Sequence, residues 1–331
     1  MLKIGLLGAG RIGQVHAATI AGHERTSLSV ISDMHEPAAV ELAKKYDAEV
    51  MSSDDIISDS SIDAVLIATS TDTHSDLIEA ATKAGKSVLC EKPVDLSLER
   101  ARACLAAVSQ TGQPVMIGFN RRFDPNFAAL KASLNSGEVG KAELLSITSF
   151  DPGPPPVSYI KVSGGLFRDM MIHDFDMANF IMGEAPVSIS ASGASLVNPE
   201  IGEAGDIDTA VVTLSYKDGQ IAVIKNSRRA GYGYDQRLEV LGSDGLLQAQ
   251  NMLENTVVKS TVGGVVSAKP TYFFLERYMS AYAAEWHAFV EAVEEQTAMP
   301  VSLQDGVLAL AMAEAAKQSF DEGKPVRLAD V

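Results

Sequence analysis

Cysteine is scarce in this sequence of 331 residues, which contains only Cys90 and Cys104. Two thiols are too few for a disulfide framework or for a zinc site built on cysteine. Long apolar runs are also missing, since no stretch approaches the roughly 18 residues of a membrane-spanning helix. The first residues lead directly into a strand pattern and leave no space for a signal peptide, so we expect a cytoplasmic protein.

Positive charge is in the minority, with 27 Lys and Arg residues against 43 Asp and Glu residues and a formal net charge of −16. Such a surface repels nucleic acid phosphates and anionic membranes, so we expect neither as a partner. A small-molecule ligand stays possible. Hydrophobic residues make up 46% of the chain, which is ordinary for a globular protein, and the length favours two domains.

Short apolar segments alternate with helical patterns over about the first 118 residues. We expect strands at 4–7, 28–31, 64–68, 88–90 and 115–117, and helices at 12–21, 36–46, 73–84 and 97–110. This alternation predicts an α/β domain with a doubly wound, mainly parallel sheet covered on both faces.

The pattern changes after about residue 120. A helix at 124–134 and a strand at 143–150 precede a proline-rich turn at 151–156 and a helix from about 165 to 182. Consecutive strands follow at 187–197, 208–216, 220–227, 236–242 and 245–250, before two closing helices at 275–296 and 304–320. Strands without helices between them predict an antiparallel sheet, so this half is α+β. We expect domains at 1–120 and 121–331.

A glycine-rich turn, Gly8-Ala9-Gly10-Arg11-Ile12-Gly13, separates the first expected strand from the first expected helix. It matches G-x-G-x-x-G, in which the first glycine permits a tight turn and the second lets the backbone approach a pyrophosphate. The third glycine allows close packing of helix on strand, and the free N–H groups at the helix start hold the phosphates. The alternative is a tight turn that binds no ligand. The context favours a dinucleotide site.

Asp33 ends the second expected strand, 20 residues after Gly13. A carboxylate there accepts hydrogen bonds from the adenine ribose hydroxyls and repels a 2′-phosphate. No Arg or Lys follows immediately, because the next residues are Met34, His35 and Glu36. We therefore expect NAD rather than NADP as the cofactor. A turn aspartate that caps the next helix is the alternative.

Two further strand ends face the edge of the sheet where ligands bind in such folds. Thr69 and Ser70 follow the strand at 64–68, and His74 enters the next helix. Glu91 and Lys92 follow the strand at 88–90. We expect all five residues to contact the cofactor, since a lysine fixed by the proline after it is positioned at the strand end. The competing interpretation of Lys92 is a surface ion pair between neighbours.

Asp169 and His173 are the main catalytic candidates of the second half. Four residues apart on one helix, they share a face, and the carboxylate can orient the imidazole and stabilise its protonated form, as a general base requires. The segment alone is equally consistent with a structural core histidine. The spacing also suits a zinc pair, although no further His or Cys cluster is visible. Asp174 and Asp176 lie on other sides of the helix and read as caps or solvated residues.

Three other segments carry weaker signals. Residues 120–123 fit a hinge with one substrate contact, for which we take Asn120. Residues 228–235 break the sheet with glycines and offer tyrosine hydroxyls to a hydroxylated ligand, or else form an irregular connection with packed aromatics. An aromatic stripe at helical spacing fits the core or a subunit interface better than a substrate site: Tyr278, Tyr282, Trp286 and Phe289.

These pieces together resemble the glucose–fructose oxidoreductase / inositol dehydrogenase / MocA family over nearly the whole chain. The resemblance rests on G-A-G-R-I-G at 8–13, E-K-P at 91–93 and the D-x-x-x-H of Asp169 and His173. It implies a Rossmann domain followed by an α+β domain with a large open antiparallel sheet. The exposed face of that sheet is expected to form a homo-oligomer, a dimer or a homotetramer.

Within the family the chain looks most like inositol 2-dehydrogenases. The similarity lies in residues 118–125, residues 155–161 leading into 163–165, and residues 232–235. It implies that Lys92 contacts the reacting hydroxyl, that His173 takes its proton and that Asp169 pairs with His173 and holds the substrate. Substrate contacts are expected from Lys92, Asn120, Tyr159, Asp169, His173 and Tyr232. The segment that contains Tyr159 varies within the family.

The implied reaction is NAD-dependent oxidation of a secondary alcohol of a cyclic polyol to a ketone, with hydride passing to nicotinamide C4. The expected substrate is myo-inositol and the product 2-keto-myo-inositol (scyllo-inosose). No metal is expected, since Lys92 supplies the positive charge for a developing alkoxide. The alternatives are a dehydrogenase or reductase of the same family acting on scyllo-inositol, an aldose or an anhydro sugar, and more remotely a non-catalytic dinucleotide-binding sensor.

Overall fold

The computed structural model describes all of residues 1–331, and the chain divides into two compact units. Unit 1 comprises Met1–Asn120 and Ala281–Leu310, and unit 2 comprises Arg121–Ser280 and Ala311–Val331. The sequence-based division places everything after residue 120 in the second domain. In the structure, residues 281–310 instead pack with the first unit.

Unit 1 is built on a six-stranded parallel sheet in the order β3-β2-β1-β4-β5-β6. Its strands are β1 (Leu2–Leu7), β2 (Thr26–Ser32), β3 (Glu49–Val50), β4 (Ala64–Ile67), β5 (Ser87–Glu91) and β6 (Val115–Gly118). The helices between them are α1 (Arg11–Ala21), α2 (Glu36–Tyr46), α3 (Ser53–Ser58), η1 (Thr71–Thr73), α4 (His74–Lys83) and α5 (Leu98–Ser109). The order reverses between β1 and β4, so the doubly wound prediction is confirmed. The short elements β3, α3 and η1 were not expected.

The late part of the chain completes unit 1. Helix α11 (Phe274–Glu295) buries Trp286, whose indole nitrogen donates to Thr26 Oγ1 at 3.3 Å. The Ile117 amide of β6 donates to the Val301 carbonyl at 3.1 Å. The aromatic stripe is buried along its whole length, in agreement with the core interpretation.

Unit 2 contains a seven-stranded sheet in the order β12-β11-β7-β10-β9-β8-β15. Its strands are β7 (Ala142–Phe150), β8 (Ser188–Ala194), β9 (Thr209–Ser215), β10 (Ile221–Ser227), β11 (Asp235–Gly242), β12 (Leu246–Ala249) and β15 (Val326–Arg327). Neighbouring strands are antiparallel except β7 and β10, which pair in parallel. The expected α+β domain is confirmed, and the sheet is mixed at this one pair because the chain crosses through several helices after β7.

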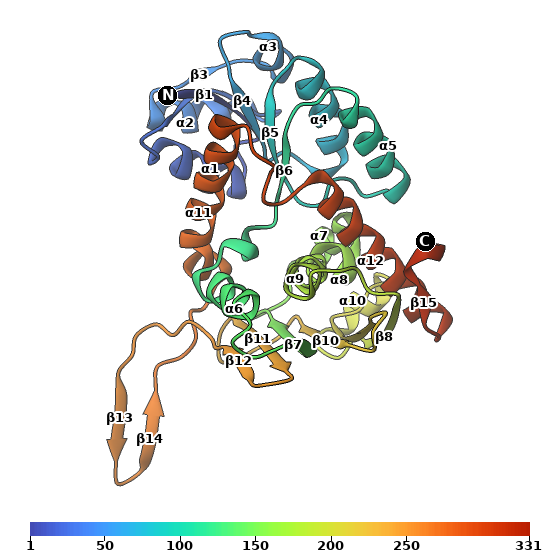
Figure 1. Ribbon diagram of the computed structural model, residues 1–331. Coiled ribbons are helices and arrows are strands. Elements are labelled where there is room, and N and C mark those ends of the chain that lie inside the picture. Colours follow the sequence, from blue (N-terminus) through green and yellow to red (C-terminus); the bar gives the residue numbers. More distant parts are fainter. The chain divides into compact units, whose positions relative to one another are not determined.

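The helices of unit 2 lie over one face of its sheet (Figure 1). They are η2 (Asn120–Phe123), α6 (Pro125–Asn135), α7 (Val157–Ser163), α8 (Gly165–Asp169), α9 (Ile172–Met182), α10 (Pro199–Glu203), η3 (Leu328–Asp330) and the part of α12 (Leu303–Glu322) that follows residue 310. The covered face buries aliphatic side chains such as Val212 and Ile224. The other face exposes alternate residues of the same strands, including Val211 and Ile221.

A hairpin that the sequence did not predict projects from unit 2 (Figure 1). Its strands, β13 (Val258–Thr261) and β14 (Gly264–Ser267), form a separate two-stranded antiparallel sheet. As for membrane insertion, none of the helices combines the length and apolar character needed to cross a bilayer.

Candidate active site

The glycine turn after β1 shows why each of its three glycines is needed. Gly8 has φ +104°, and a Cβ there would lie 2.4 Å from the Ala68 carbonyl oxygen. A Cβ on Gly13 would lie 2.0 Å from the Gly8 carbonyl oxygen. Gly10, in contrast, is exposed and has no atom within 4 Å of its Cβ position. The first and third glycines are therefore required by the turn itself, and the second leaves open space for a ligand.

That open space lies at the N-terminus of α1. Gly10 is the N-cap residue and contributes no side-chain cap, and no acidic residue occupies the first turn. The first N–H groups of the helix therefore point outward with the positive end of the helix dipole, an arrangement that binds a pyrophosphate. The turn and helix therefore have the features that bind the phosphates of a dinucleotide.

Asp33, at the end of β2, braces this turn. One of its carboxylate oxygens accepts from the Ala9 amide at 2.6 Å, and the other accepts from the His35 amide at 2.7 Å. The N-cap of α2 is His35, so Asp33 does not cap the helix as the alternative interpretation required. A carboxylate has lone pairs beyond the two used here, and these remain to accept from a ribose hydroxyl.

Asp33 both holds the glycine turn and is expected to bind the adenine ribose, so replacing it should change the preference between NAD and NADP. Asp33→Ser should raise the KM for NAD and improve the use of NADP, because it removes the ribose acceptor and the repulsion of a 2′-phosphate together. Asp33→Asn is the matched control, since it keeps one acceptor for the backbone amides but loses the charge. Initial rates with both cofactors report the result. A NAD to NADP preference unchanged in both variants would contradict the assignment and leave Asp33 with the bracing role alone.

The ends of β4 and β5 are tied together by His74. Its buried imidazole places Nδ1 2.8 Å from the Pro93 carbonyl oxygen and Nε2 3.2 Å from the Thr69 carbonyl oxygen. The Thr69 hydroxyl lies 2.7 Å from that of Thr73, whose hydroxyl also donates to the Ser70 carbonyl. His74 therefore holds the two strand ends in register, and its proposed cofactor contact stays a prediction.

Glu91 has a partner that sequence reasoning missed. Its carboxylate lies 2.7 Å from Nε2 of the buried His16 on α1, and its other oxygen accepts from the Lys92 amide at 3.3 Å. The His16 ring also packs edge-on against Tyr282, at 5.4 Å between centroids. Glu91 thus links the helix that follows the glycine turn to the strand end that carries the half-buried Lys92. No spacing rule marks a histidine in mid-helix, so the sequence held no signal for this contact.

The predicted single helix from 165 to 182 is wrong, because it is two helices that break at Met170 and Met171. The Leu166 carbonyl accepts from both of these amides, at 3.1 and 2.9 Å, which interrupts the α-helical pattern. Asp169 therefore ends α8, and His173 lies in the first turn of α9. The same-face argument, which assumed one continuous helix, does not apply across this break.

Asp169 is held by two side chains of unit 2. The Tyr159 hydroxyl donates to one carboxylate oxygen at 3.0 Å, and the buried Arg228 approaches the other at 3.5 Å. Tyr159 and Asp169, both predicted to bind substrate, are thus brought together. Arg228 was not among the predicted site residues.

Asp151 is a second residue that the sequence did not single out. Burial raises its pKa to about 6, against the opposing effect of the nearby Arg228 and Arg121, while Asp169 and Asp174 raise it further. The Asp151 amide donates to the Ser227 carbonyl at 2.9 Å, which fixes the start of the proline-rich turn. The carboxylate therefore belongs to the same polar region as Asp169.

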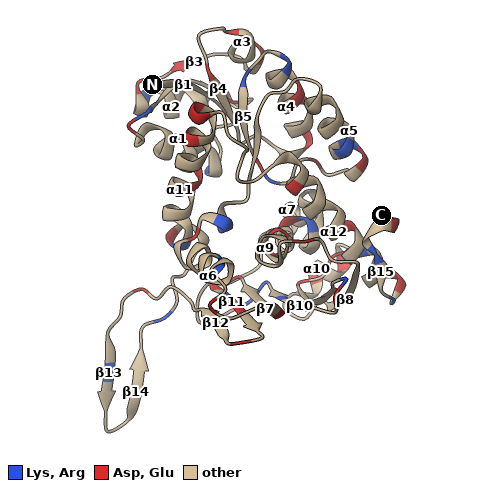
Figure 2. Ribbon diagram, viewed as in Figure 1, with Lys and Arg blue, Asp and Glu red and all other residues tan.

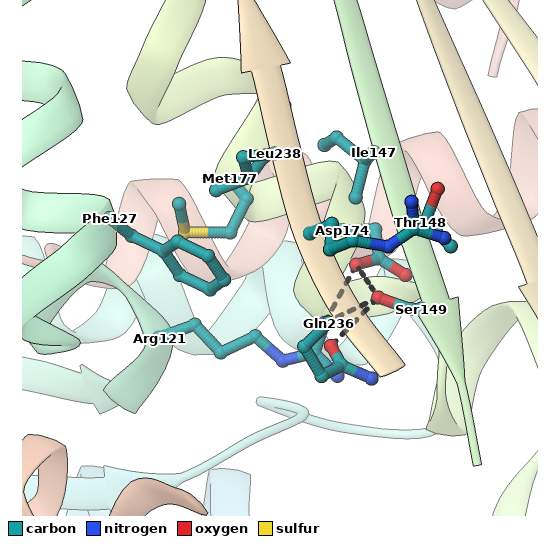
Figure 3. Close-up of a pocket in the computed structure, with 10 residues that line it drawn as sticks. Arg121, Phe127, Ile147, Thr148, Ser149, Asp174, Met177, Gln236 and Leu238 are labelled. Atoms are coloured by element: carbon teal, nitrogen blue, oxygen red, sulfur yellow. Dashed lines mark hydrogen bonds and ion pairs between the residues drawn. The ribbon is translucent and has the colours of Figure 1, made fainter. Parts of the chain in front are cut away.

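Asp174 is fully buried, which corrects its interpretation as a cap or solvated residue. It accepts from Arg121 at 2.7 Å and from Asn226 at 2.8 Å, and Ser149 Oγ lies 2.6 Å away. Ser149 Oγ also lies 2.9 Å from the Gln236 side-chain oxygen. Figure 3 shows the side chains of Arg121, Ser149, Asp174 and Gln236 meeting beside apolar ones such as Phe127 and Met177. The pocket that they line leaves no space for a water molecule. The cluster is therefore a structural network rather than a ligand site.

Asp176 needs the same correction. It is buried, and its carboxylate binds the guanidinium of Arg122, with Nε 2.9 Å from Oδ2 and Nη2 2.5 Å from Oδ1. Both arginines of the predicted hinge at 120–123 are thus fixed in buried ion pairs. Asn120 is buried at the start of the same short helix.

Tyr232 is half exposed in the connection between β10 and β11, and its hydroxyl donates to Asp235 at 2.6 Å. Burial and the hydrogen bond to Asp235 raise the pKa of Tyr232 to about 12. Its hydroxyl oxygen can still accept a hydrogen bond. Contacts of Tyr232 and Asn120 with substrate stay predictions.

Two family models match the chain. The NAD-binding Rossmann fold of an oxidoreductase family, GFO/IDH/MocA, matches residues 2–119, and the C-terminal alpha/beta domain of the same family matches residues 131–328. The first match agrees with the cofactor geometry at the glycine turn, and NAD is the cofactor.

Similar proteins cover the full chain. An inositol 2-dehydrogenase of Rhizobium meliloti (strain 1021) is 48% identical over 99% of this chain and 99% of its own. The structure of a myo-inositol dehydrogenase from Corynebacterium glutamicum ATCC 13032 has a TM-score of 0.96 and 44% identity, covering 99% of both chains. A scyllo-inositol dehydrogenase from Lactobacillus casei, with NAD(H) and scyllo-inositol bound, has a TM-score of 0.93 and 29% identity, also covering 99% of both. The chain therefore belongs to the GFO/IDH/MocA family of oxidoreductases.

Proposed function

We propose that this protein oxidises a ring hydroxyl of an inositol to a ketone, with myo-inositol as substrate and 2-keto-myo-inositol as product. The observation that carries the proposal is the full-length similarity to an inositol 2-dehydrogenase, in a chain that has Lys92, Asp169 and His173 at the positions of the family motifs. The exposed Gly10 and the braced Asp33 support the cofactor half of the proposal.

In unit 1, the N-terminus of α1 would hold the pyrophosphate, and Asp33 would bind the adenine ribose. Bound NAD supplies the hydride acceptor. Glu91 binds His16 and accepts a hydrogen bond from the Lys92 amide, so the main chain of Lys92 is held in place at the end of β5. The ammonium group of Lys92 therefore extends from a fixed point of the main chain. Its role is to bind the reacting hydroxyl and to stabilise negative charge on that oxygen.

In unit 2, His173 is the proposed base that takes the hydroxyl proton. Asp169 is the proposed acceptor for a neighbouring substrate hydroxyl, and it is held for that role by Tyr159 and Arg228. A polyol presents several hydroxyls in a fixed pattern, and fixed carboxylate and phenol groups recognise such a pattern by directed hydrogen bonds. Placement of the reacting carbon and a matched base then account for the rate acceleration.

One alternative has a specific observation in its favour. The similar structure that holds scyllo-inositol shows that the family's fold also serves another inositol isomer. Aldoses and anhydro sugars are further family alternatives. A non-catalytic dinucleotide sensor is the remote one, and the presence of all three proposed catalytic residues argues against it.

The substrate proposal is tested by initial rates with NAD across myo-inositol, scyllo-inositol, other inositol isomers and aldohexoses. We expect the highest kcat/KM with myo-inositol, and we expect the ketone to be identified by mass spectrometry. The highest kcat/KM on an aldose, with negligible turnover of myo-inositol, would contradict the proposal. Highest kcat/KM with scyllo-inositol would transfer the assignment to that isomer.

We also propose that copies of the chain associate through the uncovered face of the seven-stranded sheet. No helix of unit 2 covers this face, and it exposes apolar side chains among polar ones: Leu144, Val211, Ile221 and Leu241. A flat, partly apolar sheet face of this kind buries its side chains against an identical face about a twofold axis.

A further inference from the structure

His16 is a polar residue in the apolar core of unit 1. It lies in the second turn of α1, between the buried Val15 and Ala17, and is itself 1% exposed. Its Nε2 lies 2.7 Å from Oε1 of Glu91, the last residue of β5. An ionised carboxylate only accepts hydrogen bonds, so Nε2 is the donor whether the ring is neutral or protonated. The contact therefore satisfies a group that is costly to leave unpaired in the core.

The position of the Glu91 carboxylate is determined by three elements. Its Oε1 is bound by His16 on α1, and its Oε2 accepts from the Lys92 amide at 3.3 Å. Gly118, at the end of β6, pairs with Glu91 in the parallel register. A Cβ on Gly118 would lie 3.2 Å from both Oε2 and Cα of Glu91, so the glycine leaves the room that the carboxylate needs.

The partial exposure of Glu91 makes His16 its critical partner. The Glu91 side chain is 12% exposed, and a carboxylate at the edge of solvent can turn to water and release the Lys92 amide. The buried imidazole prevents this because it binds the carboxylate from within the core, where Tyr282 of α11 packs against the ring at 5.4 Å between centroids. His16 therefore keeps the carboxylate in the position in which it binds the Lys92 amide.

We propose that His16 is a positioning residue for Lys92 in the dehydrogenase reaction, an inference that rests on the proposed function. Helix α1 carries at its N-terminus the N–H groups expected to bind the pyrophosphate, and in its second turn it carries His16. One helix thus positions both the cofactor and, through Glu91, the main chain of Lys92. A displacement of about 1 Å between reacting groups costs on the order of 10²-fold in rate. The role of His16 is to keep Lys92 at a fixed spacing from the cofactor.

The competing explanation is that the pair of His16 and Glu91 serves stability alone. Loss of the pair would then lower Tm, while the folded protein would still turn over substrate at the wild-type rate. A positioning role predicts that kcat falls in the folded protein. It also predicts that the KM for NAD changes little, because the glycine turn is intact.

Three variants of the full-length protein and one control separate these explanations. His16→Leu removes the donor and keeps the site apolar. His16→Gln places an amide N–H near the position of Nε2 and so keeps the donor. Gly118→Ala acts from β6, where its methyl group crowds Oε2 of Glu91. Thr82→Val is the control, because it removes another buried hydrogen bond of unit 1, from Thr82 Oγ1 to the Ile78 carbonyl.

Initial rates with NAD and myo-inositol give kcat and KM, and calorimetry gives Tm. We expect His16→Leu to lower kcat about tenfold or more, with the KM for NAD within about threefold of wild type, and Gly118→Ala to lower kcat as well. His16→Gln should recover most of the loss, and Thr82→Val should keep wild-type kcat at a lower Tm.

Wild-type kcat in both His16→Leu and Gly118→Ala would overturn the proposal. A loss of kcat in Thr82→Val as large as in His16→Leu would overturn it too, since the effect would then follow from stability. A rise in the KM for NAD without a change in kcat would also contradict it. A loss in His16→Gln equal to that in His16→Leu would overturn the role of the Nε2 donor.

A second measurement needs no substrate. Trinitrobenzenesulfonate labels lysine amines, and peptide mass spectrometry gives the labelling rate of the half-buried Lys92 relative to Lys44, which is exposed on α2. Figure 2 shows further basic residues on the helices of unit 1, whose lysines serve as additional references. The relative rate at Lys92 should rise about threefold or more in His16→Leu, because the released main chain exposes the amine, and should match wild type in His16→Gln.

The labelling separates this inference from the proposed function. A wild-type protein that oxidises no inositol would contradict the proposed function, and the labelling rates would still decide whether His16 positions Lys92. If His16→Leu does not fold, Gly118→Ala decides, since it displaces the same carboxylate. An unchanged labelling rate at Lys92 in Gly118→Ala would then overturn the link from the Glu91 carboxylate to Lys92.

Discussion

Replacing His173 with alanine is expected to lower kcat by about 10²–10⁴-fold while NADH still binds with unchanged affinity. The physical reason is that the proposed base lies in the first turn of α9 in unit 2, whereas the glycine turn and Asp33 lie in unit 1. Stopped-flow or steady-state rates give kcat, and fluorescence titration gives the dissociation constant for NADH.

His287→Ala is the matched control, because this histidine is exposed on α11 and pairs only with surface groups. It should retain wild-type kcat. The His173 test is decisive because of the break between α8 and α9. Asp169 and His173 lie on different helices, so a shared helix face no longer supports the role of His173 as a base. Wild-type turnover in His173→Ala would mean that another group takes the proton.

Replacing Arg121 with methionine is expected to destabilise the protein by about 3–5 kcal/mol. The substitution leaves the carboxylate of Asp174 buried without its cation, and the desolvation cost of that charge is then uncompensated. In a unit of this size the loss corresponds to a fall in Tm on the order of 10 °C. Calorimetry and urea unfolding measure both quantities.

The pH dependence of that loss identifies its cause. Burial raises the pKa of Asp174, against the effect of Arg121, Ser149 and Asn226, so the native state binds this proton more tightly than the unfolded chain does. The contribution of such a group to stability is greatest below its unfolded pKa and is lost as the pH rises through its folded pKa. Without Arg121 the folded pKa rises further. The loss of unfolding free energy caused by Arg121→Met should therefore be larger at pH 8 than near pH 5.

Asp174→Asn supplies the contrast. This variant leaves the Arg121 guanidinium buried, and a guanidinium cannot lose its charge in a protein. The loss of unfolding free energy in Asp174→Asn should therefore not become smaller at low pH. The double variant Arg121→Met/Asp174→Asn should recover part of the stability, because neither charge remains. Equal deficits at pH 5 and pH 8 for Arg121→Met would contradict the account of an unpaired carboxylate.

The features that local chemistry determines were predictable from the sequence. The glycine turn is one, because the positive φ of Gly8 and the clash of a Gly13 Cβ with the Gly8 carbonyl both arise within a single strand–turn–helix unit. The alternation of strands and helices in unit 1 is another, since it follows from apolar periodicity. Asp33 was placed correctly at the strand end, although its bond to the Ala9 amide depends on the packing of two loops.

The features that were predicted wrongly or missed depend on tertiary contacts, or on local hydrogen bonding that sequence patterns do not record. Asp174 looked like a solvated helix residue, yet it is buried because Arg121, 53 positions earlier, and Asn226, 52 positions later, converge on it. The break at Met170 arises from the way the Leu166 carbonyl is shared, which no propensity scale records. His16 and Glu91 meet across 75 positions.

The return of residues 281–310 to unit 1 has a consequence for the order of synthesis. Trp286 donates to Thr26, and the Val301 carbonyl accepts from the amide of Ile117. The dinucleotide-binding unit is therefore made of two stretches of sequence, one before residue 121 and one after residue 280, with most of unit 2 between them in the sequence. When the ribosome has finished β6, the glycine turn has been synthesised. The residues of 281–310 that pack with this unit have not yet been made. The first unit to begin folding therefore reaches its complete core only after the whole of β7 to β14 has been translated.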